Sequence, residues 1–370
     1  MKKEVLDEAY KKAIECLRIC SAPNGLFASG GKNGYKGVWA RDSMISLIGA
    51  SSGKDNNGFI KEQFKKSLIT LGKHQSEHGQ IPNAVLKFDG KKPQVDYLSI
   101  DSGLWFVIGH YVHKKKYGNS LFKRYKKEIE KAITWLSCQD MGEDAMLEQL
   151  PTTDWQDAFP HRYGRTINTQ ALYYKVLNLI GDKNELLKLK KDVNENNDIK
   201  LWNNEFYYSY RWKNHGKYKE IGNWFDSLGN LLAIVFELAD KKQAEKIISH
   251  IKKNKINLPY PVKSIFPPIR RGSRYWEDYY MDCDARKPYH YLNAGIWPYI
   301  GGFYVLALIK LRRFKEAEEE LEKLAEANLK GNFPEWIDPT NKKTHGKLQA
   351  WNAGAYILAY NSLKKKKAMI

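Results

Sequence analysis

The chain has 370 residues, of which 42% are hydrophobic and 28% charged, and its formal net charge is +19. This composition is typical of a globular protein with enough apolar material for a core. The strong positive charge makes nucleic-acid binding a hypothesis that must be considered. Most of the charge is lysine dispersed over the polar faces of helical patterns, and neither zinc-finger spacing nor an aromatic RNA-binding motif is present. We therefore expect no specific nucleic-acid partner.

The four cysteines, Cys16, Cys20, Cys138 and Cys283, have no His or Cys partners at ligand spacing. Neither a metal site nor a disulfide framework is therefore indicated. The N-terminus lacks the apolar core of a signal peptide, and no run of about 18 apolar residues occurs. We expect a cytoplasmic, reduced protein without a membrane partner, and the sequence leaves its oligomeric state open.

Helical patterns dominate the N-terminal part of the chain. Apolar residues at helical spacing predict helices over residues 4–20, 59–75 and 121–138, and residues 97–106 lead into a further apolar helix through Val107, Ile108, Tyr111 and Val112. A glycine-rich loop, residues 23–37, lacks the Gly-Lys-Ser/Thr ending of a phosphate loop. It leads into Trp39-Ala40-Arg41-Asp42, where a further helix starts. The Arg-Asp pair beside a tryptophan is either a helix-start ion pair or a polar clamp for a sugar.

A loop near the middle of the chain carries the most informative polar residues. Asp154 and Asp157 flank Trp155, and a helical pattern begins near Thr166. A carboxylic acid pressed against aromatic rings loses hydration, so its pKa rises and it can act as a general acid. The alternative is that Asp154 only caps the following turn.

The C-terminal part repeats the paired-helix pattern. We predict helices over residues 224–238, 241–251, 291–311, 314–329 and 347–363. The aromatic cluster 206–212 is either a short hairpin or a sugar-facing loop, and 254–289 is irregular. Because strands do not alternate with helices and no linker is visible, we predict one all-α domain, residues 1–370, built as an α/α toroid with long aromatic loops at one face.

Several short motifs follow one another along residues 38–360. They are Trp39-Ala40-Arg41-Asp42, Gly79-Gln80-Ile81-Pro82-Asn83, Ile100-Asp101-Ser102-Gly103-Leu104-Trp105-Phe106, Trp155-Gln156-Asp157-Ala158, residues 167–173, Asn293-Ala294-Gly295-Ile296-Trp297-Pro298, Phe333-Pro334-Glu335-Trp336 and Gln349-Ala350-Trp351. Together they resemble the six-hairpin glycosidases, the clan of glucoamylases, trehalases, neutral invertases and the glucosidase domain of glycogen debranching enzymes. The resemblance implies an (α/α)6 barrel.

The resemblance also implies the catalytic pair. Asp157 stands where the clan keeps its general acid, and Glu335 stands where it keeps its general base, with Asp154 as the second choice for the acid. The clan inverts, so we expect the two carboxyl groups roughly 6.5–9.5 Å apart, with room for a water molecule. We further expect Glu335 to be hydrogen-bonded and ionised and Asp157 to be the drier of the two.

A terminal sugar would be held by other motif residues. These are Trp39, Arg41, Asp42, Asp101, Asp154, Trp155, Gln170, Trp297, Trp336 and Trp351. For each tryptophan the competing interpretation is packing between helices. Acid–base hydrolysis requires neither a metal nor an organic cofactor.

The motifs leave the substrate open. Asp101-Ser102-Gly103 is closer to invertases, whereas Trp155-Gln156-Asp157-Ala158 is closer to debranching enzymes, so either sucrose or an α-glucoside fits. The chain is short for the family, so long polymers are the less secure substrates. Two other classes compete: a sugar epimerase using His161, His290 or His345 as bases, and a non-catalytic polyanion-binding protein.

Overall fold

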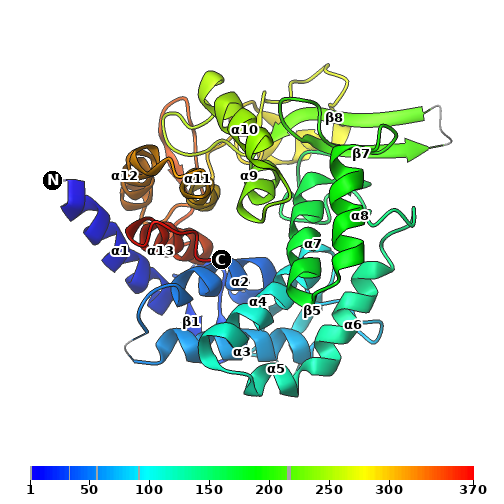
Figure 1. The fold of residues 1–370 in the computed structure, drawn as a ribbon. Coiled ribbons are helices and arrows are strands. Elements are labelled where there is room, and N and C mark those ends of the chain that lie inside the picture. Colours follow the sequence, from blue (N-terminus) through cyan, green and yellow to red (C-terminus); the bar gives the residue numbers. More distant parts are fainter. Residues whose placement is uncertain (1, 33, 56, 91, 215–217) are drawn as a thin grey trace.

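A computed structural model describes residues 2–32, 34–55, 57–90, 92–214 and 218–370. Within these ranges six helices form an inner ring, in which each helix contacts the next and the last closes on the first (Figure 1). They are α2 (Ala40–Ser51), α4 (Asp101–Tyr117), α7 (Ile167–Ile180), α9 (Ser227–Val235), α11 (Pro298–Lys310) and α13 (Ala350–Lys364). This closed ring confirms the predicted all-α (α/α)6 toroid.

The remaining helices surround this ring (Figure 1). They are α1 (Lys2–Ile19), α3 (Phe59–Lys73), α5 (Ser120–Arg124), α6 (Lys126–Ser137), α8 (Lys183–Asn194), α10 (Lys241–Lys253) and α12 (Phe314–Gly331). Burial explains the two layers. Every residue of α2 is buried, whereas α10 buries only Ala244, Ile247, Ile248 and Ile251 along one stripe. A helix that is buried all round belongs inside, and an amphipathic helix covers it.

Short antiparallel strands lie in the loops between helices. They are β1 (Ser21–Ala22), β2 (Gly25–Leu26), β3 (Gly37–Trp39), β4 (Ala84–Leu86), β5 (Gln94–Asp96), β6 (Arg165–Thr166), β7 (Tyr208–Asn214), β8 (Tyr218–Asp226), β9 (Ile265–Phe266), β10 (Trp336–Ile337) and β11 (Thr344–His345). They pair as β1–β2, β3–β4–β5, β6–β7–β8–β9 and β10–β11. The cluster 206–212 is thus part of a hairpin, one of its two predicted forms.

Several predicted helix boundaries were wrong, and three of them have a clear physical reason. The pattern 224–238 begins as strand, because Trp224 lies in β8 and Asp226 caps α9 by accepting a hydrogen bond from the backbone N–H of Gly229. The pattern 121–138 is broken at Tyr125 between α5 and α6. The pattern 291–311 starts only at Pro298, since proline suits the first helical turn.

The inner helices α2 and α13 cross at backbone distance. A Cβ atom built on Gly49 would lie 2.1 Å from the carbonyl oxygen of Gly354, so neither glycine tolerates a side chain. Buried apolar residues from Leu6 to Ala359 form one continuous core cluster. Among the described residues, no helix combines the length and apolar character needed to span a bilayer.

Candidate active site

A small cavity of about 90 Å³ lies where α2, α11 and α13 begin. Its lining comes from these helix starts and from the loops between helices. The lining residues are Ala28, Tyr35, Trp39, Arg41, Asp42, Trp155, Asp157, Tyr291, Trp297, Glu335, Gln349 and Trp351. The cavity therefore brings together Asp157 and Glu335, which the sequence separates by nearly half of the chain.

Glu335 is held by the hairpin that follows it. Its backbone N–H donates to the carbonyl oxygen of His345 at 2.8 Å, and the side-chain amide of Asn352 donates to the carbonyl oxygen of Pro334. Gly346, with φ of +64°, lies so close that a Cβ atom there would be 2.7 Å from the Cβ of Glu335. Only glycine fits both that conformation and that space. The local backbone therefore leaves Glu335 little freedom.

The carboxylate of Glu335 accepts a hydrogen bond inside the cavity. The hydroxyl of Tyr35 donates to Glu335 Oε1 at 3.2 Å. Loss of hydration raises the pKa of Glu335 to about 7, the Tyr35 hydrogen bond opposes this rise, and the charges of Asp42 and Asp157 add to it. The predicted hydrogen bond to Glu335 is thus confirmed, but the predicted full ionisation at neutral pH is not.

Tyr35→Phe is expected to move the acidic limb of the kcat/KM profile to higher pH. The variant loses the hydrogen bond that favours ionised Glu335, so the pKa of this carboxyl rises further above its ordinary value. At pH 7 the activity of the variant should be lower than that of the unaltered protein, on the order of a few-fold, and at pH 9 the two activities should be equal. A pH–rate profile of both proteins measures this. A uniform loss at every pH would contradict the role of Tyr35 in ionisation.

Asp157 is more exposed than expected. It lines the cavity but is exposed to solvent, whereas Glu335 is only partly exposed, so the prediction of a drier Asp157 was wrong. Desolvation by the surrounding protein raises the pKa of Asp157, and the nearby charge of Arg41 opposes the rise. Contact with water favours the charged form of Asp157 and lowers its pKa, whereas desolvation by the surrounding protein raises this pKa. Water therefore still solvates part of the Asp157 carboxylate in the free protein.

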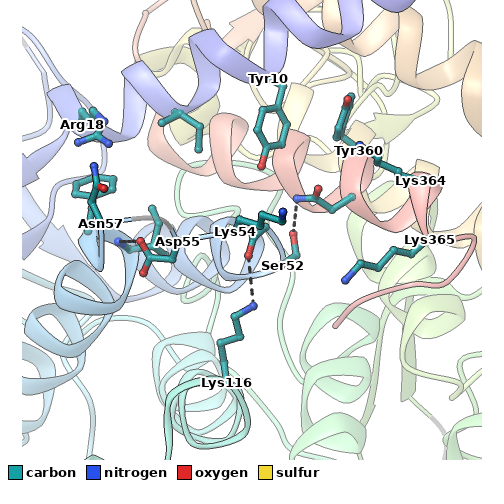
Figure 2. Close-up of a pocket in the computed structure, with 15 residues that line it drawn as sticks. Tyr10, Arg18, Ser52, Lys54, Asp55, Asn57, Lys116, Tyr360, Lys364 and Lys365 are labelled. Carbon is teal, nitrogen blue, oxygen red and sulfur yellow. Dashed lines mark hydrogen bonds between the residues drawn. The ribbon is translucent and has the colours of Figure 1, made fainter.

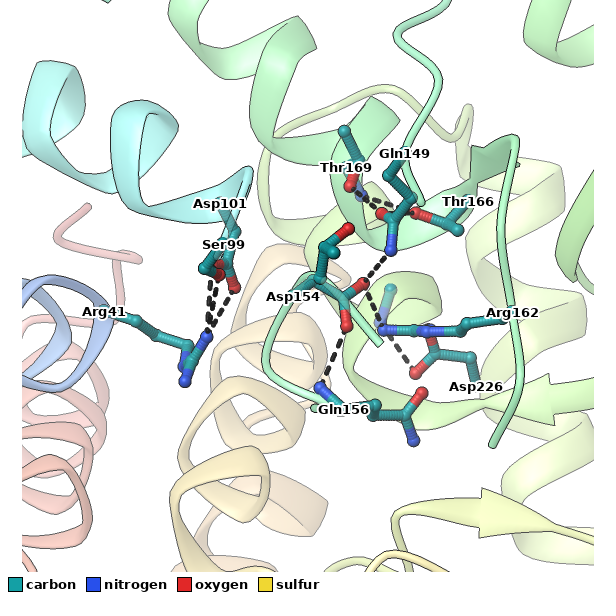
Figure 3. A network of polar contacts seen from close by, with 12 residues as sticks. Arg41, Ser99, Asp101, Gln149, Asp154, Gln156, Arg162, Thr166, Thr169 and Asp226 are labelled. Atoms are coloured by element: carbon teal, nitrogen blue, oxygen red, sulfur yellow. Dashed lines mark hydrogen bonds and ion pairs between the residues drawn. The ribbon is translucent and has the colours of Figure 1, made fainter. Parts of the chain in front are cut away.

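A buried ion pair supports the cavity floor. The Nη1 atom of Arg41 lies 3.1 Å from both carboxylate oxygens of Asp101, and Ser99 donates a hydrogen bond to the same carboxylate (Figure 3). Arg41 and Asp42 both line the cavity, but Asp101 lies outside the lining. Loss of hydration raises the pKa of Asp42 to about 6, against the opposing charge of Arg41. Asp101 thus holds Arg41 in place from behind the lining, and its predicted contact with a sugar stays a prediction.

Asp154 belongs to a separate buried network. Arg162 lies between two carboxylates, donating to Asp154 Oδ2 at 2.7 Å and to Asp226, while Gln149 also donates to Asp154 (Figure 3). The backbone N–H of Gln156 donates to Asp154 Oδ1 at 2.9 Å, which is the turn-capping contact of the alternative interpretation. Asp154 is buried and outside the cavity lining, unlike the sugar ligand or acid predicted for it. Its contacts support the Asp157 loop from behind.

Arg162→Met is expected to destabilise the protein by about 3–5 kcal/mol, because two carboxylates would remain buried without a cationic partner. The midpoint of urea unfolding measures the effect. Arg271→Met on the exposed surface is the matched control and should leave that midpoint unchanged. Equal midpoints for both variants would show that the network contributes little to stability.

Aromatic residues form the cavity walls and also pack on one another. The Trp297 ring lies 5.8 Å from those of Trp155 and Trp351, both edge-on, and Tyr299 stacks on Trp351 at 4.2 Å. The two interpretations of these tryptophans are therefore compatible. Trp39, which also lines the cavity, meets the Tyr35 ring edge-on at 6.2 Å.

Two further predicted ligands lie outside the lining. Trp336 stacks on His345 with ring centroids 3.9 Å apart, so it packs behind Glu335. The side chain of Gln170 bonds the backbone N–H and carbonyl of Leu147 at 3.0 and 2.7 Å. Their positions differ from the predicted contact with a sugar, because neighbouring protein groups already occupy these side chains.

Among the lining residues that the structure describes, the sequence interpretation missed Ala28, Tyr35, Tyr291 and Gln349. Gln349 lay inside a motif whose tryptophan alone was selected. Tyr35 gave no signal, because nothing in the glycine-rich loop 23–37 indicates which side chain faces the base. The histidines considered as epimerase bases, His161, His290 and His345, are not among the lining residues. In the described part of the chain, no group of His, Cys, Asp and Glu is arranged to hold a metal ion.

Comparisons with known proteins relate the chain to sugar hydrolases of similar sequence or fold. The sequence model of the alkaline and neutral invertase family matches residues 217–366. Alkaline/neutral invertase C, mitochondrial, of Arabidopsis thaliana is 24% identical over 319 residues, covering 70% of this chain and 47% of that protein. Neutral/alkaline invertase 3, chloroplastic, of Oryza sativa subsp. japonica is 25% identical, covering 98% and 74%. The chain spans about half the length of most of the curated relatives it matches.

Solved structures share the architecture. The GH63 mannosylglycerate hydrolase from Thermus thermophilus, in complex with Tris and D-glycerate, superposes with a TM-score of 0.71 at 13% identity, covering 94% of this chain and 99% of that one. At this identity the likeness establishes the fold.

Proposed function

We propose that this chain, a member of the six-hairpin glycosidase clan as its motifs predicted, is an inverting glycoside hydrolase that releases a terminal sugar. The observation that carries the proposal is the placement of Asp157 and Glu335 in one small cavity with aromatic walls. Two carboxyl groups facing one sugar ring supply the acid and the base that hydrolysis of a glycosidic bond requires.

In this mechanism Asp157 protonates the glycosidic oxygen as its bond to the anomeric carbon breaks. Glu335 removes a proton from a water molecule that attacks the same carbon from the opposite face. A bound sugar covers the exposed Asp157 and displaces its water, so the pKa of Asp157 rises further and its proton is retained until the bond breaks. Because the charge of Asp157 contributes to the raised pKa of Glu335, the pH–rate profile reports macroscopic pKa values of the interacting pair.

Asp42 and Arg41 are the polar groups best placed to bind sugar hydroxyls. Both are buried and line the cavity, and the Arg41 guanidinium is held in place by Asp101. The faces of Trp39, Trp297 and Trp351 suit the apolar faces of a pyranose or furanose ring. A hollow this small favours a single sugar ring at the point of cleavage, and hence attack at a chain end.

Glucose release from an α-glucoside or short oligoglucan is our first candidate reaction, on the strength of the Trp155-Gln156-Asp157-Ala158 motif. Hydrolysis of sucrose is the second candidate. The match of residues 217–366 to the alkaline and neutral invertase family supports it.

Incubation with a panel of glycosides tests the proposal. The panel contains sucrose, maltose, isomaltose, trehalose, branched dextrins and mannosylglycerate, the last named for the structural neighbour. NMR of the first product, before mutarotation, should show inverted anomeric configuration. If the product were an isomerised sugar without a new reducing end, the protein would be an epimerase and not a hydrolase. Retention of configuration would overturn the inverting mechanism.

A further inference from the structure

A second, larger cavity lies at the other end of the inner helices. It has a volume of about 780 Å³ and is lined by residues of α1, of the segment between α2 and α3, of the start of α3 and of the C-terminal ends of α4 and α13 (Figure 2). Helix α2 has 12 residues, so about 18 Å of helix separates this cavity from Arg41 at the active site. A ligand here would not touch a sugar bound beside Asp157.

Cationic side chains converge on this cavity. Arg18, Lys54, Lys116, Lys364 and Lys365 line it, and among the described lining residues the single carboxylate is that of Asp55. Within the described part of the chain, no salt bridge joins Lys54, Lys364 or Lys365 to a carboxylate. The Nζ atom of Lys116 donates to the carbonyl oxygen of Gly53 at 3.3 Å (Figure 2).

The negative charge of Asp55 is already engaged. Its carboxylate accepts hydrogen bonds from the backbone N–H groups of Ile60 and Lys61, at 3.2 and 2.8 Å, at the start of α3. The cavity therefore has a strong excess of positive charge, and an anion is the ligand that this excess favours.

Helix dipoles explain part of this arrangement. Arg18, Lys116 and Lys364 each lie in the last turn of a helix, where a cation is stabilised by the negative end of the dipole. That effect acts on each helix separately. It does not account for three basic helix ends meeting with Lys54 and Lys365 around one hollow.

An aromatic wall lines another part of the same cavity. The rings of Tyr10 and Tyr360 lie 4.8 Å apart, and the Arg18 guanidinium lies 4.7 Å from the centroid of the Phe59 ring. The absence of a side chain on Gly53 keeps room for the Tyr10 hydroxyl, which would lie 2.7 Å from a Cβ atom there. Such a wall offers a surface for a flat or ring-shaped organic group.

We propose that this cavity binds a small soluble anion that carries a phosphate group on a ring-bearing organic part. The lysines and Arg18 hold the phosphate, and Tyr10 and Tyr360 contact the ring. A concave site of this volume fits a small molecule better than a membrane surface or an extended polymer. The site is distinct from the proposed glycosidase centre and does not depend on it.

Isothermal titration calorimetry at low ionic strength tests the proposal. The probes are glucose 6-phosphate, ATP, inorganic phosphate and, as the uncharged control, glucose. We expect saturable one-site binding of at least one ring-bearing phosphate, weaker binding of inorganic phosphate, none of glucose, and loss of affinity as salt is added. Failure of every phosphorylated probe to saturate would overturn the site.

A pair of charge reversals locates the binding. Lys364→Glu with Lys365→Glu should weaken binding at least ten-fold. Lys242→Glu with Lys253→Glu, two exposed lysines of α10 outside the cavity, makes the same change in net charge and should leave affinity within two-fold. Equal losses in the two variants would mean non-specific attraction to a basic protein and would overturn the proposal.

Two further measurements separate the remaining outcomes. Tyr10→Leu should weaken the binding of the ring-bearing probe several-fold and leave the binding of inorganic phosphate unchanged. If the variant and the unaltered protein bound the ring-bearing probe with equal affinity, the proposed aromatic contact would be overturned. Vesicles of phosphatidylglycerol form the second arm. If the protein bound vesicles but no soluble phosphate compound, the ligand of this site would be a membrane surface, and the proposal of a small molecule would be overturned. Hydrolytic activity of both lysine variants should equal that of the unaltered protein, whatever the substrate proves to be.

Discussion

Glu335→Gln is expected to lower kcat by about 10²–10⁴-fold while sugar binding is retained. Glutamine has nearly the shape of glutamate and can still accept the hydrogen bond from Tyr35, but it cannot remove a proton from water. Single-turnover and steady-state rates on the best substrate of the panel measure the loss, and calorimetry with the product sugar measures binding.

The matched control for this variant is Glu318→Gln on the exposed face of α12, which should leave kcat unchanged. A loss of less than ten-fold in Glu335→Gln would remove Glu335 from the role of base. Loss of sugar binding together with activity would instead indicate that Glu335 serves mainly to hold the ligand.

Asp157→Asn is expected to lower kcat on a natural glycoside by a similar factor, about 10²–10⁴-fold. Its loss should be much smaller on an aryl glycoside with an acidic phenol as the leaving group, because such a group departs without a proton. Glu335→Gln should remain slow on the same aryl glycoside, since attack by water still lacks its base. Kinetics of both variants on both substrates therefore assign the acid and the base separately.

Asp42 provides the competing assignment for the acid. It lines the same cavity, and loss of hydration raises its pKa to about 6. If Asp42→Asn showed the dependence on leaving group and Asp157→Asn did not, Asp42 would replace Asp157 as the proton donor. Asp154→Asn is a different case, because it should reduce stability through Arg162 rather than show any dependence on the leaving group.

Local patterns in the sequence predicted much of the helical framework. When one side of a helix is buried, apolar residues recur along the sequence about every 3.6 residues. This spacing can be found in the chain without a structure, as it can for α10. The starts of α2 and α7, which are buried nearly all round, were also close to their predicted positions. Trp224 was misplaced because an apolar run of aromatic residues suits a buried strand as well as a helix.

For the candidate active site too, the sequence predicted some features and only the folded structure showed the others. The motifs alone selected Glu335, Arg41 and Asp42 as candidates and ranked Asp157 before Asp154, because each lies in a short segment whose residue types are recognisable without neighbours. They could not separate Asp154 from Asp157. Arg162 and Asp226 come from elsewhere in the chain, and only their approach in the folded protein shows that Asp154 is engaged in a buried ion pair.

The sequence by itself determined the class of fold, the clan and the two candidate carboxyl groups, since residue type and spacing are properties of the chain. Only the tertiary structure decided which side chains share one cavity, that Tyr35 donates to Glu335, and that basic helix ends gather opposite the active site. These features depend on distances between segments far apart in the chain. Closure of the helical ring sets those distances, and no local pattern encodes them.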